Sequence, residues 1–170
     1  MNGRKQVDIA QAAKSILEQI PKGAFLTVKD GSRVNTMTIG WGTIGRMWNK
    51  PVFMVMVRYS RFTYEIIEKS SAFTVSVPLN GKFKEALAVC GSKSGRDVDK
   101  FKECGLKAVP GEKVDVPVIE GCDIHVECRI LYKEPLAPEK LPKDIIDACY
   151  KDGDFHVLYF GEILGVYEEV

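Results

Sequence analysis

The sequence contains no apolar run long enough to cross a membrane, and its first residues, MNGRKQVDIAQ, carry no apolar segment typical of a secretory signal. It also lacks an excess of positive charge, because 24 Lys and Arg residues stand against 23 Asp and Glu residues. Without a large basic field, nucleic acid is a poor candidate partner. These absences predict a cytoplasmic protein that binds neither a membrane nor nucleic acid.

Metal-ligand and disulfide patterns are missing as well. Histidine occurs only twice, and the five cysteines include no C-x-x-C pair, which argues against a zinc site and against a paired disulfide framework. We therefore expect reduced, mostly buried thiols and no bound metal. No G-x-S-x-G motif is present, so a serine hydrolase of that type is not expected.

The composition that remains is that of an ordinary globular protein. Apolar residues make up 45% of the 170 residues and charged residues 28%, which allows a hydrophobic core and argues against disorder. No repeat of fixed period and no long linker divides the chain. We expect a single domain over residues 1–170.

Apolar spacing and turn residues predict many strands and a few short helices. Helical spacing runs over residues 9–20 and ends at Pro21. Asp30-Gly31 predicts a hairpin between two strands. The predicted strands are 23–29, 33–39, 51–57, 72–77, 116–119, 122–132 and 156–166, and the shorter helices are 61–69, 83–90 and 145–150.

The order of these elements favours a mainly β fold. Strands and short helices alternate irregularly, and no glycine-rich phosphate motif follows the first strand, so a doubly wound parallel sheet fits less well. We predict a closed or partly closed antiparallel β-barrel with peripheral helices. Strand 122–132 alternates apolar and polar residues, which predicts a half-buried strand with His125 and Glu127 on its polar face. Gly161 and Gly165 are expected to interrupt the last strand.

Two arginines and two hydroxyl residues follow the apolar strand 51–57. They are Arg58, Ser60, Arg61 and Thr63. They lie where the strand turns into the next predicted helix, for which Ser60 is a candidate N-cap. A phosphate binds positive charge, hydroxyl donors and free backbone N–H groups, and a helix N-terminus supplies the last of these. The pattern indicates a phosphate cradle, although a solvated helix start with a capping serine has the same pattern.

A strand that carries hydroxyl groups leads into a glycine-rich bend at residues 40–45. The candidate residues are Asn35, Thr36, Met37 and Thr38 in the strand, and Trp41, Gly42 and Thr43 in the bend. Glycine lets a flat ring approach the backbone, where N–H groups can bond to ring carbonyls and a tryptophan can cover the ring. A β-bulge beside a core tryptophan has the same pattern.

Loop 90–97 and His156 complete the set of candidates. The loop is basic and glycine-containing, and its Ser94 and Arg96 are candidates for contact with a phosphate or a second substrate, although most loops of this type are only solvated. His156 belongs to no metal cluster and to no catalytic motif. Its residue type alone does not indicate catalysis.

Taken together, these segments resemble the flavin reductase-like family of FMN-binding split barrels, and within it the flavoredoxin type. The similarity covers nearly the whole chain and is carried by NTMTIGWGT at 35–43, PV at 51–52, RYSRFT at 58–63, SGRDVDKF at 94–101 and DFHVLYFGEI at 154–163. The resemblance implies a split-barrel homodimer with FMN bound near the dimer interface.

The resemblance also implies roles for the candidate residues. Residues 35–38 and 41–43 would line the flavin ring and ribityl chain, and the Arg58 to Thr63 set would hold the phosphate, with Ser94 and Arg96 as further cofactor contacts. His156 matches a histidine near the nicotinamide site of related flavin reductases. Here Phe155 separates it from Asp154, whereas many relatives have the two adjacent.

Three functions are compatible with this resemblance. The favoured one is FMN-dependent reduction by NADH or NADPH, with electrons passed to free flavin, a ferric complex or another acceptor. Flavin carries the redox chemistry, so no protein nucleophile is expected. The alternative is a flavoredoxin-type electron-transfer module reduced by a protein partner. A non-redox flavin- or haem-binding barrel is the third, and the sequence lacks a haem-ligand motif.

Overall fold

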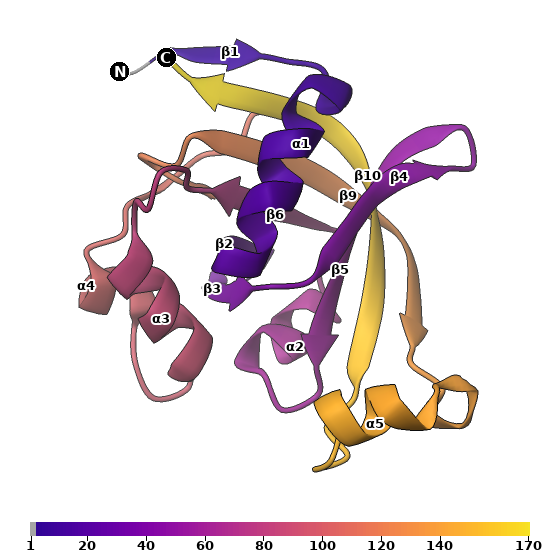
Figure 1. Cartoon of the computed structure of the whole chain (residues 1–170). Coiled ribbons are helices and arrows are strands. Elements are labelled where there is room, and N and C mark those ends of the chain that lie inside the picture. Colours follow the sequence, from indigo (N-terminus) through magenta and orange to yellow (C-terminus); the bar gives the residue numbers. More distant parts are fainter. Residues whose placement is uncertain (1–2) are drawn as a thin grey trace.

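Antiparallel strands make up more of the structure than helices do (Figure 1). The computed structural model describes residues 3–170. The strands are β1 (Arg4–Gln6), β2 (Ala24–Asp30), β3 (Arg33–Ile39), β4 (Gly42–Met47), β5 (Lys50–Arg58), β6 (Ala72–Val77), β7 (Ala108–Val109), β8 (Val118–Ile119), β9 (Ile124–Pro135) and β10 (His156–Glu169). The helices are α1 (Ile9–Gln19), α2 (Phe62–Ile67), α3 (Lys84–Ser92), α4 (Lys100–Cys104) and α5 (Lys143–Cys149), with short 3₁₀ turns at Ile20–Lys22 and Pro138–Lys140.

One eight-stranded sheet organises the molecule. Its spatial order is β3-β2-β6-β9-β10-β5-β4, and β1 pairs in addition with β10. The long strand β10 pairs with β9 on one edge, while its other edge pairs first with β5 and then, at its last residues, with β1. All of these pairings are antiparallel, so the predicted mainly β, antiparallel architecture with peripheral helices is confirmed.

Local sequence signals account for the first elements. Asp8 caps α1, because its carboxylate accepts a backbone N–H at 2.7 Å and Gln11 completes a capping box. Gly31 has a φ of 57° in the predicted turn between β2 and β3. The turn between β4 and β5 places Trp48 and Asn49 at φ values of 51° and 58°, which matches the right-handed twist of a tight hairpin.

Apolar side chains form two clusters on opposite faces of β2. Leu26 and Val28 belong to the larger cluster, which joins α1 and α2 to the sheet. Phe25, which points the other way, belongs to a smaller cluster with α3 and the segment that follows α4. The helices α3 and α4 are therefore held on the outer side of β2, next to the end of β3 (Figure 1).

Two expectations about element boundaries are wrong. The glycine-rich stretch 40–45 is not a bend, because residues from Gly42 onward form β4 and pair with β5. Ser60 does not cap α2, because the helix begins at Phe62 and Arg61 occupies the N-cap position without a side-chain hydrogen bond. Pairing with β5 makes the glycine-rich stretch a strand, and the Ser60 hydroxyl donates to Asp154 instead of capping the helix. The local sequence does not show either of these contacts.

The last strand is continuous rather than interrupted. Gly161 and Gly165 mark two register shifts in the pairing of β10 with β9. A Cβ on Gly161 would come within 2.6 Å of the Phe73 ring and 2.7 Å of Cys128. Glycine is needed at this position because two neighbouring side chains occupy the space of a side chain.

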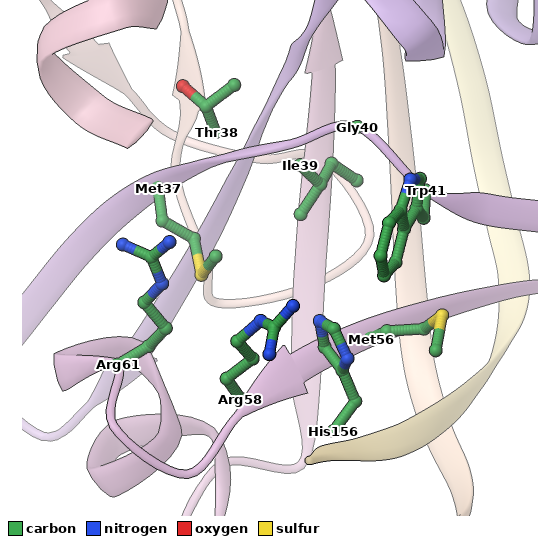
Figure 2. Close-up of a pocket in the computed structure, with 9 residues that line it drawn as sticks. All are labelled: Met37, Thr38, Ile39, Gly40, Trp41, Met56, Arg58, Arg61 and His156. Atoms are coloured by element: carbon green, nitrogen blue, oxygen red, sulfur yellow. The ribbon is translucent and has the colours of Figure 1, made fainter. Parts of the chain in front are cut away.

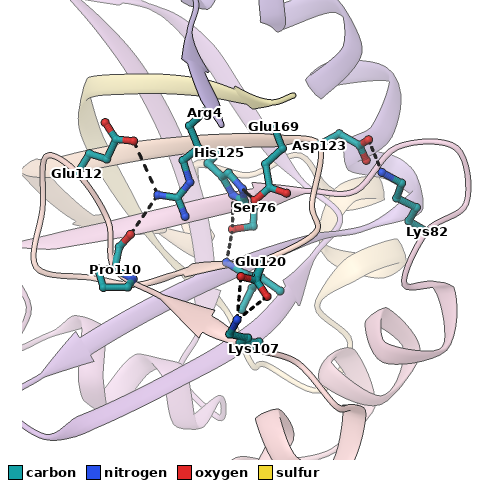
Figure 3. Close-up of polar contacts among 11 residues, drawn as sticks. Arg4, Ser76, Lys82, Lys107, Pro110, Glu112, Glu120, Asp123, His125 and Glu169 are labelled. Carbon is teal, nitrogen blue, oxygen red and sulfur yellow. Dashed lines mark hydrogen bonds and ion pairs between the residues drawn. The ribbon is translucent and has the colours of Figure 1, made fainter. Parts of the chain in front are cut away.

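The predicted polar face of strand 122–132 is buried at His125 and Glu127, while Arg129 at its end is exposed. His125 lies 3.1 Å from the Ser76 hydroxyl through Nδ1 and 3.2 Å from Glu169 through Nε2 (Figure 3). The Glu127 carboxylate accepts the backbone N–H groups of residues 112, 113 and 114 at 2.8, 2.7 and 3.0 Å. The segment between β7 and β8 therefore covers this face, and a buried carboxylate is tolerated because its oxygens are hydrogen-bonded.

The thiols agree with the prediction from the sequence. All five cysteines are free, with Cys90, Cys122 and Cys128 buried and the other two partly exposed. Among residues 3–170, none of the helices combines the length and apolar character that a membrane span requires.

Candidate functional site

A cavity of about 190 Å³ opens where the ends of β3 and β5 meet the start of β10 (Figure 2). It is lined by Met37, Thr38, Ile39, Gly40, Trp41, Met56, Arg58, Arg61 and His156. Met56 and Arg58 alternate along β5 with the core residues Val55 and Val57, so they lie on the opposite face of that strand. The cavity combines apolar side chains, one indole and two guanidinium groups.

His156 lies in the wall of this cavity and is largely buried. Its Nδ1 lies 2.7 Å from the hydroxyl of Tyr150, and the Trp41 ring is 5.4 Å away between centroids. Burial, together with the positive charges of Arg58 and Arg61, lowers the pKa of His156 to about 4, while Asp154 acts in the opposite direction. The imidazole is therefore neutral at physiological pH.

Arg58 is bound to the connection between α5 and β10. Its guanidinium donates to the carbonyl oxygen of Asp154 at 2.5 Å and to that of Cys149 at 2.9 Å, and it lies 5.0 Å from the centre of the Tyr150 ring. These contacts orient the side chain beside His156, as Figure 2 shows. Arg58 therefore contributes charge to the first cavity while it fastens a remote segment to β5.

A second cavity of about 110 Å³ adjoins the first. It is lined by Asn35, Met37, Ser60, Arg61, Phe62, Thr63, Ser92, Lys93, Ser94, Gly95, Arg96 and Lys100. Met37 and Arg61 line both cavities, so they mark the junction between them. The structure brings together Asn35, Ser60, Arg61, Thr63, Ser94 and Arg96 of the predicted set, and places Arg58 on the other side of the junction.

Positive charge dominates the second cavity. Its basic side chains are Arg61, Lys93, Arg96 and Lys100, and among the described residues no aspartate or glutamate lines it. Lys100 is only 4% exposed, and its ammonium donates to the carbonyl oxygen of Cys90 at 2.8 Å. Burial lowers the pKa of Lys100, and the Arg61 guanidinium acts in the same direction. Lys93 and Arg96 form ion pairs with Glu103 and Glu65, so an anion in this cavity would be favoured chiefly by Arg61 and Lys100.

Hydroxyl and amide groups around the second cavity already have partners within the chain. The Asn35 amide donates to Thr63 Oγ1 at 2.9 Å. The backbone N–H and the hydroxyl of Ser60 donate to the two carboxylate oxygens of Asp154, at 3.2 and 2.5 Å. Ser94 Oγ accepts the backbone N–H of Arg96 at 3.2 Å. These bonds hold the polar groups in place without a ligand.

Three of the predicted site residues do not line either cavity. Thr36 is fully buried, and its hydroxyl accepts from Thr27 and donates to the carbonyl oxygen of Leu26. Gly42 belongs to β4, where a Cβ would come within 3.0 Å of the Phe53 ring. Thr43 is exposed on the same strand. Packing of the sheet accounts for Thr36 and Gly42.

Several lining residues were not among the predicted candidates. They are Ile39, Gly40, Met56, Phe62 and Lys100, while Ser92, Lys93 and Gly95 belong to the candidate loop 90–97 without having been singled out. Gly95 has a distinct reason to be glycine, because a Cβ there would lie 2.3 Å from Asn35 Oδ1 and 2.7 Å from Phe62. The basic, glycine-containing loop was the sequence signal that could have identified Lys93 and Gly95. Among the described residues, no group of three or more His, Cys, Asp or Glu side chains is placed to bind a metal.

Comparison with known proteins identifies the family. Residues 19–169 match the family described as the flavin reductase like domain, and the chain belongs to it. A protein of Shewanella frigidimarina described as having a split barrel domain superposes with a TM-score of 0.68 over 86% of this chain and 66% of that chain, at 16% identity. This similarity establishes the fold of the chain as a split barrel.

Two further solved structures are more similar in sequence. Flavoredoxin of Desulfovibrio vulgaris (Miyazaki F) is 26% identical, with a TM-score of 0.68 over 86% of this chain and 69% of that chain. An FMN-binding protein from Thermus thermophilus, solved with bound 1-cyclohex-2-enone, is 28% identical, with a TM-score of 0.67 over 86% of this chain and 70% of that chain.

Three curated relatives are described as uncharacterized proteins. An uncharacterized protein of Archaeoglobus fulgidus is 29% identical over 146 residues, which cover 86% of this chain and 72% of the relative. The matched segment spans 62% of a relative from Pyrococcus abyssi and 54% of YddH from Escherichia coli, both also uncharacterized.

Proposed function

We propose that the two adjoining cavities bind FMN and that the protein is an oxidoreductase in which electrons pass through the bound flavin, with NADH or NADPH as the donor. The observation that carries this proposal is the junction at Met37 and Arg61, where a cavity with aromatic and apolar walls meets a strongly basic one. FMN has the same two parts, a flat ring system and a phosphate at the end of a flexible chain.

The residues present fit both parts of this ligand. Trp41, Met37 and Met56 offer apolar surface to a ring, and Gly40 has no side chain between its backbone and the first cavity. The second cavity suits a phosphate dianion, because Arg61 and Lys100 supply charge and the Ser94 hydroxyl, which accepts the N–H of Arg96, can donate its own proton.

The protein would contribute binding and orientation. The flavin supplies the hydride and electron chemistry when it is bound. The buried Lys100 and the junction residue Arg61 would fix the phosphate, and the tightly bonded Arg58 would present positive charge to the ring cavity. That charge favours the negative charge that a flavin ring gains on reduction.

We also propose that the protein acts as a homodimer that completes this site. The first cavity is small for a flavin ring, because ligand pockets of this kind enclose roughly 300 to 1,000 Å³. Beside it, β4 is the last strand of the sheet order, and the exposed Trp41 and Trp48 lie at its two ends. A second copy packed along β4 would cover both tryptophans and the mouth of the cavity.

A titration with FMN tests the cofactor proposal. Arg61→Ala should weaken FMN binding about 5- to 150-fold, equivalent to about 1–3 kcal/mol, because a charge-assisted hydrogen bond to the phosphate is lost. Riboflavin, which lacks the phosphate, should bind both proteins equally. Arg4→Ala is the matched control, since Arg4 lies on β1, outside both cavities, and donates to the carbonyl oxygen of Pro110. Equal FMN affinity in wild type and Arg61→Ala would contradict the assignment.

The electron donor is tested separately. Purified protein loaded with FMN is mixed anaerobically with NADH or NADPH, and the flavin absorbance is followed. Loss of the visible flavin band supports the reductase function. Bleaching by a reduced ferredoxin-type protein, with none from either pyridine nucleotide, supports the flavoredoxin-type alternative, for which the similarity to the Desulfovibrio vulgaris protein speaks. Failure of the colourless protein to take up FMN would reject both.

A further inference from the structure

Tyr150 and His156 form an isolated pair of hydrogen-bonding groups behind the first cavity. Tyr150 directly follows α5, and His156 is the first residue of β10. The Tyr150 hydroxyl lies 2.7 Å from His156 Nδ1, and the two rings are nearly perpendicular, at 82° with centroids 5.5 Å apart. Both residues are buried, so the contact is shielded from water.

Two neighbours hold the Tyr150 ring in this position. Phe155 stacks on it, with centroids 4.7 Å apart and planes inclined by 19°. The guanidinium of Arg58 lies over the ring at 5.0 Å and is itself bonded to the carbonyl oxygens of Cys149 and Asp154. Phe155 and Arg58 therefore hold the Tyr150 ring in place and so fix the distance between its phenol and the imidazole of His156.

The environment determines which group donates. If His156 donated from Nδ1, the buried Tyr150 O–H would need a second acceptor, and among residues 3–170 its hydroxyl has no bond other than the one to His156. A buried unsatisfied donor costs about 1–3 kcal/mol, so the phenol donates and Nδ1 accepts. Burial raises the pKa of Tyr150, so the phenol keeps the proton that it donates, and burial together with the Arg58 charge lowers the pKa of His156 and so disfavours a second proton on the imidazole.

The other ring nitrogen faces the site. Within the described chain, Nε2 of His156 makes no hydrogen bond to a protein atom, and the imidazole lines the first cavity beside Arg58 and Trp41 (Figure 2). A neutral imidazole that accepts at Nδ1 must carry its proton at Nε2. We propose that Tyr150 is a positioning residue that holds His156 as the neutral Nε2–H tautomer, so that the cavity presents a hydrogen-bond donor to its ligand.

The charges around His156 keep it in this form over a wide pH range. The groups that face it are Arg58 of β5, Arg61 of the turn before α2, and Asp154 and Tyr150 of the α5–β10 connection. Burial and the two arginines outweigh the single carboxylate, which places the pKa of His156 at about 4. Above pH 5.5 the group therefore donates one hydrogen bond and carries no charge.

This chemistry restricts the ligand. An Nε2–H donor pairs with a carbonyl oxygen or an unprotonated ring nitrogen, and it leaves an ammonium or other pure donor unpaired. The identity of that ligand as a flavin or its redox partner rests on the proposed function. The tautomer itself does not, because it follows from the Tyr150 contact alone.

Nitrogen NMR of the imidazoles tests the tautomer without any flavin. The chain has two histidines, so ¹⁵N-labelled protein gives two sets of side-chain resonances, which His125→Gln assigns. Between pH 5.5 and 8, His156 should show a protonated Nε2 and an unprotonated Nδ1. In Tyr150→Phe the population should shift toward the Nδ1–H form. The control Tyr167→Phe removes a buried phenol hydroxyl that has no hydrogen-bond partner among residues 3–170, and it should leave His156 unchanged. A protonated Nδ1 in the wild type, or an unchanged tautomer in Tyr150→Phe, overturns the proposal.

A second measurement links the tautomer to the site. With FMN-loaded protein, Tyr150→Phe should lower the reduction rate at saturating donor about 2- to 10-fold, as expected for misdirecting one neutral hydrogen bond, with little change in FMN affinity. Equal reduction rates in Tyr150→Phe and wild type would overturn the role of Tyr150 in the site. If no donor reduces the wild type, the proposed function fails, and the NMR result still decides the tautomer.

Discussion

Arg58 and Arg61, three residues apart, have different roles in this structure. Arg58 is bonded to the carbonyl oxygens of Cys149 and Asp154, whereas Arg61 lies at the junction of the two cavities and donates to the carbonyl oxygen of Gly91. Sequence reasoning treated them as equivalent phosphate ligands. The difference arises because the α5–β10 connection, about ninety residues away, provides acceptors for one of them and not for the other.

The depressed pKa of His156 predicts a pH dependence of stability. An exposed histidine has a pKa of 6.5 and His156 has one of about 4, so the unfolded chain binds the proton first as the pH falls. The stabilisation is complete above about pH 6.5 and is lost as the pH falls toward 4. Urea unfolding of the wild type should therefore lose about 2–3 kcal/mol more than His156→Gln between pH 7 and 4.5.

The comparison with His156→Gln isolates this group. Burial also lowers the pKa of His125, which is present in both proteins and cancels from the difference. Parallel curves of unfolding free energy against pH for the two proteins would show that His156 titrates normally in the folded state.

At the scale of elements, the loop between α3 and α4 is the part that completes the basic cavity. Lys93, Ser94, Gly95 and Arg96 line the cavity from this loop. Gly95 lies against β3 and α2, so closely that a Cβ would meet Asn35 and Phe62. The loop therefore depends on one residue without a side chain to reach the opposite wall.

Gly95→Ala should push this loop away from β3. Overpacking of this kind costs about 1–3 kcal/mol of stability, and FMN affinity should fall about tenfold as the basic side chains retreat. Isothermal titration with FMN, alongside urea unfolding, measures both effects. Gly3→Ala is the control, because a Cβ at Gly3, which precedes β1 and lies outside both cavities, would make an ordinary contact of 3.4 Å with Val170. An affinity in Gly95→Ala equal to that of the control would show that the loop does not contribute to binding.

At the scale of the molecule, aromatic side chains of the β4–β5 turn, β9 and β10 lie close together and form a partly exposed patch. Trp48 is 55% exposed and lies 6.4 Å from Tyr132, which in turn lies 5.8 Å from Phe160. Met47 extends the patch along β4. An apolar surface of this kind at a sheet edge is typical of an interface between subunits.

A charge placed in this patch should separate the subunits. In sedimentation velocity, the wild type is expected to run as a dimer, and Tyr132→Glu combined with Met47→Glu as a monomer, because two carboxylates would have to be buried at the interface. Leu17→Glu, at an exposed apolar position on α1, is the control and should remain dimeric. A wild type that sediments as a monomer at micromolar concentration would reject the dimer.

The sequence by itself determined most of the secondary structure. The alternation of apolar residues defined the long strands, Asp30-Gly31 fixed the first hairpin, and helical spacing defined α1, since these signals are local. It also pointed to the two segments, 35–43 and 58–63, that contribute much of the lining of the candidate site. Arg61 and Trp41 could be proposed as ligand-binding residues because their residue types and local sequence positions alone suggest contact with a phosphate and with a flat ring.

Only the tertiary structure decided which side chains meet. Loops that fold over the sheet bury His125 and Glu127. Segments remote in sequence also place Lys100 in the basic cavity and bring Tyr150 into contact with His156. Arg58 was likewise reassigned by partners remote in sequence. Local propensity carries no record of such partners, because the energy of a buried polar group depends on the remote atoms that satisfy its hydrogen bonds.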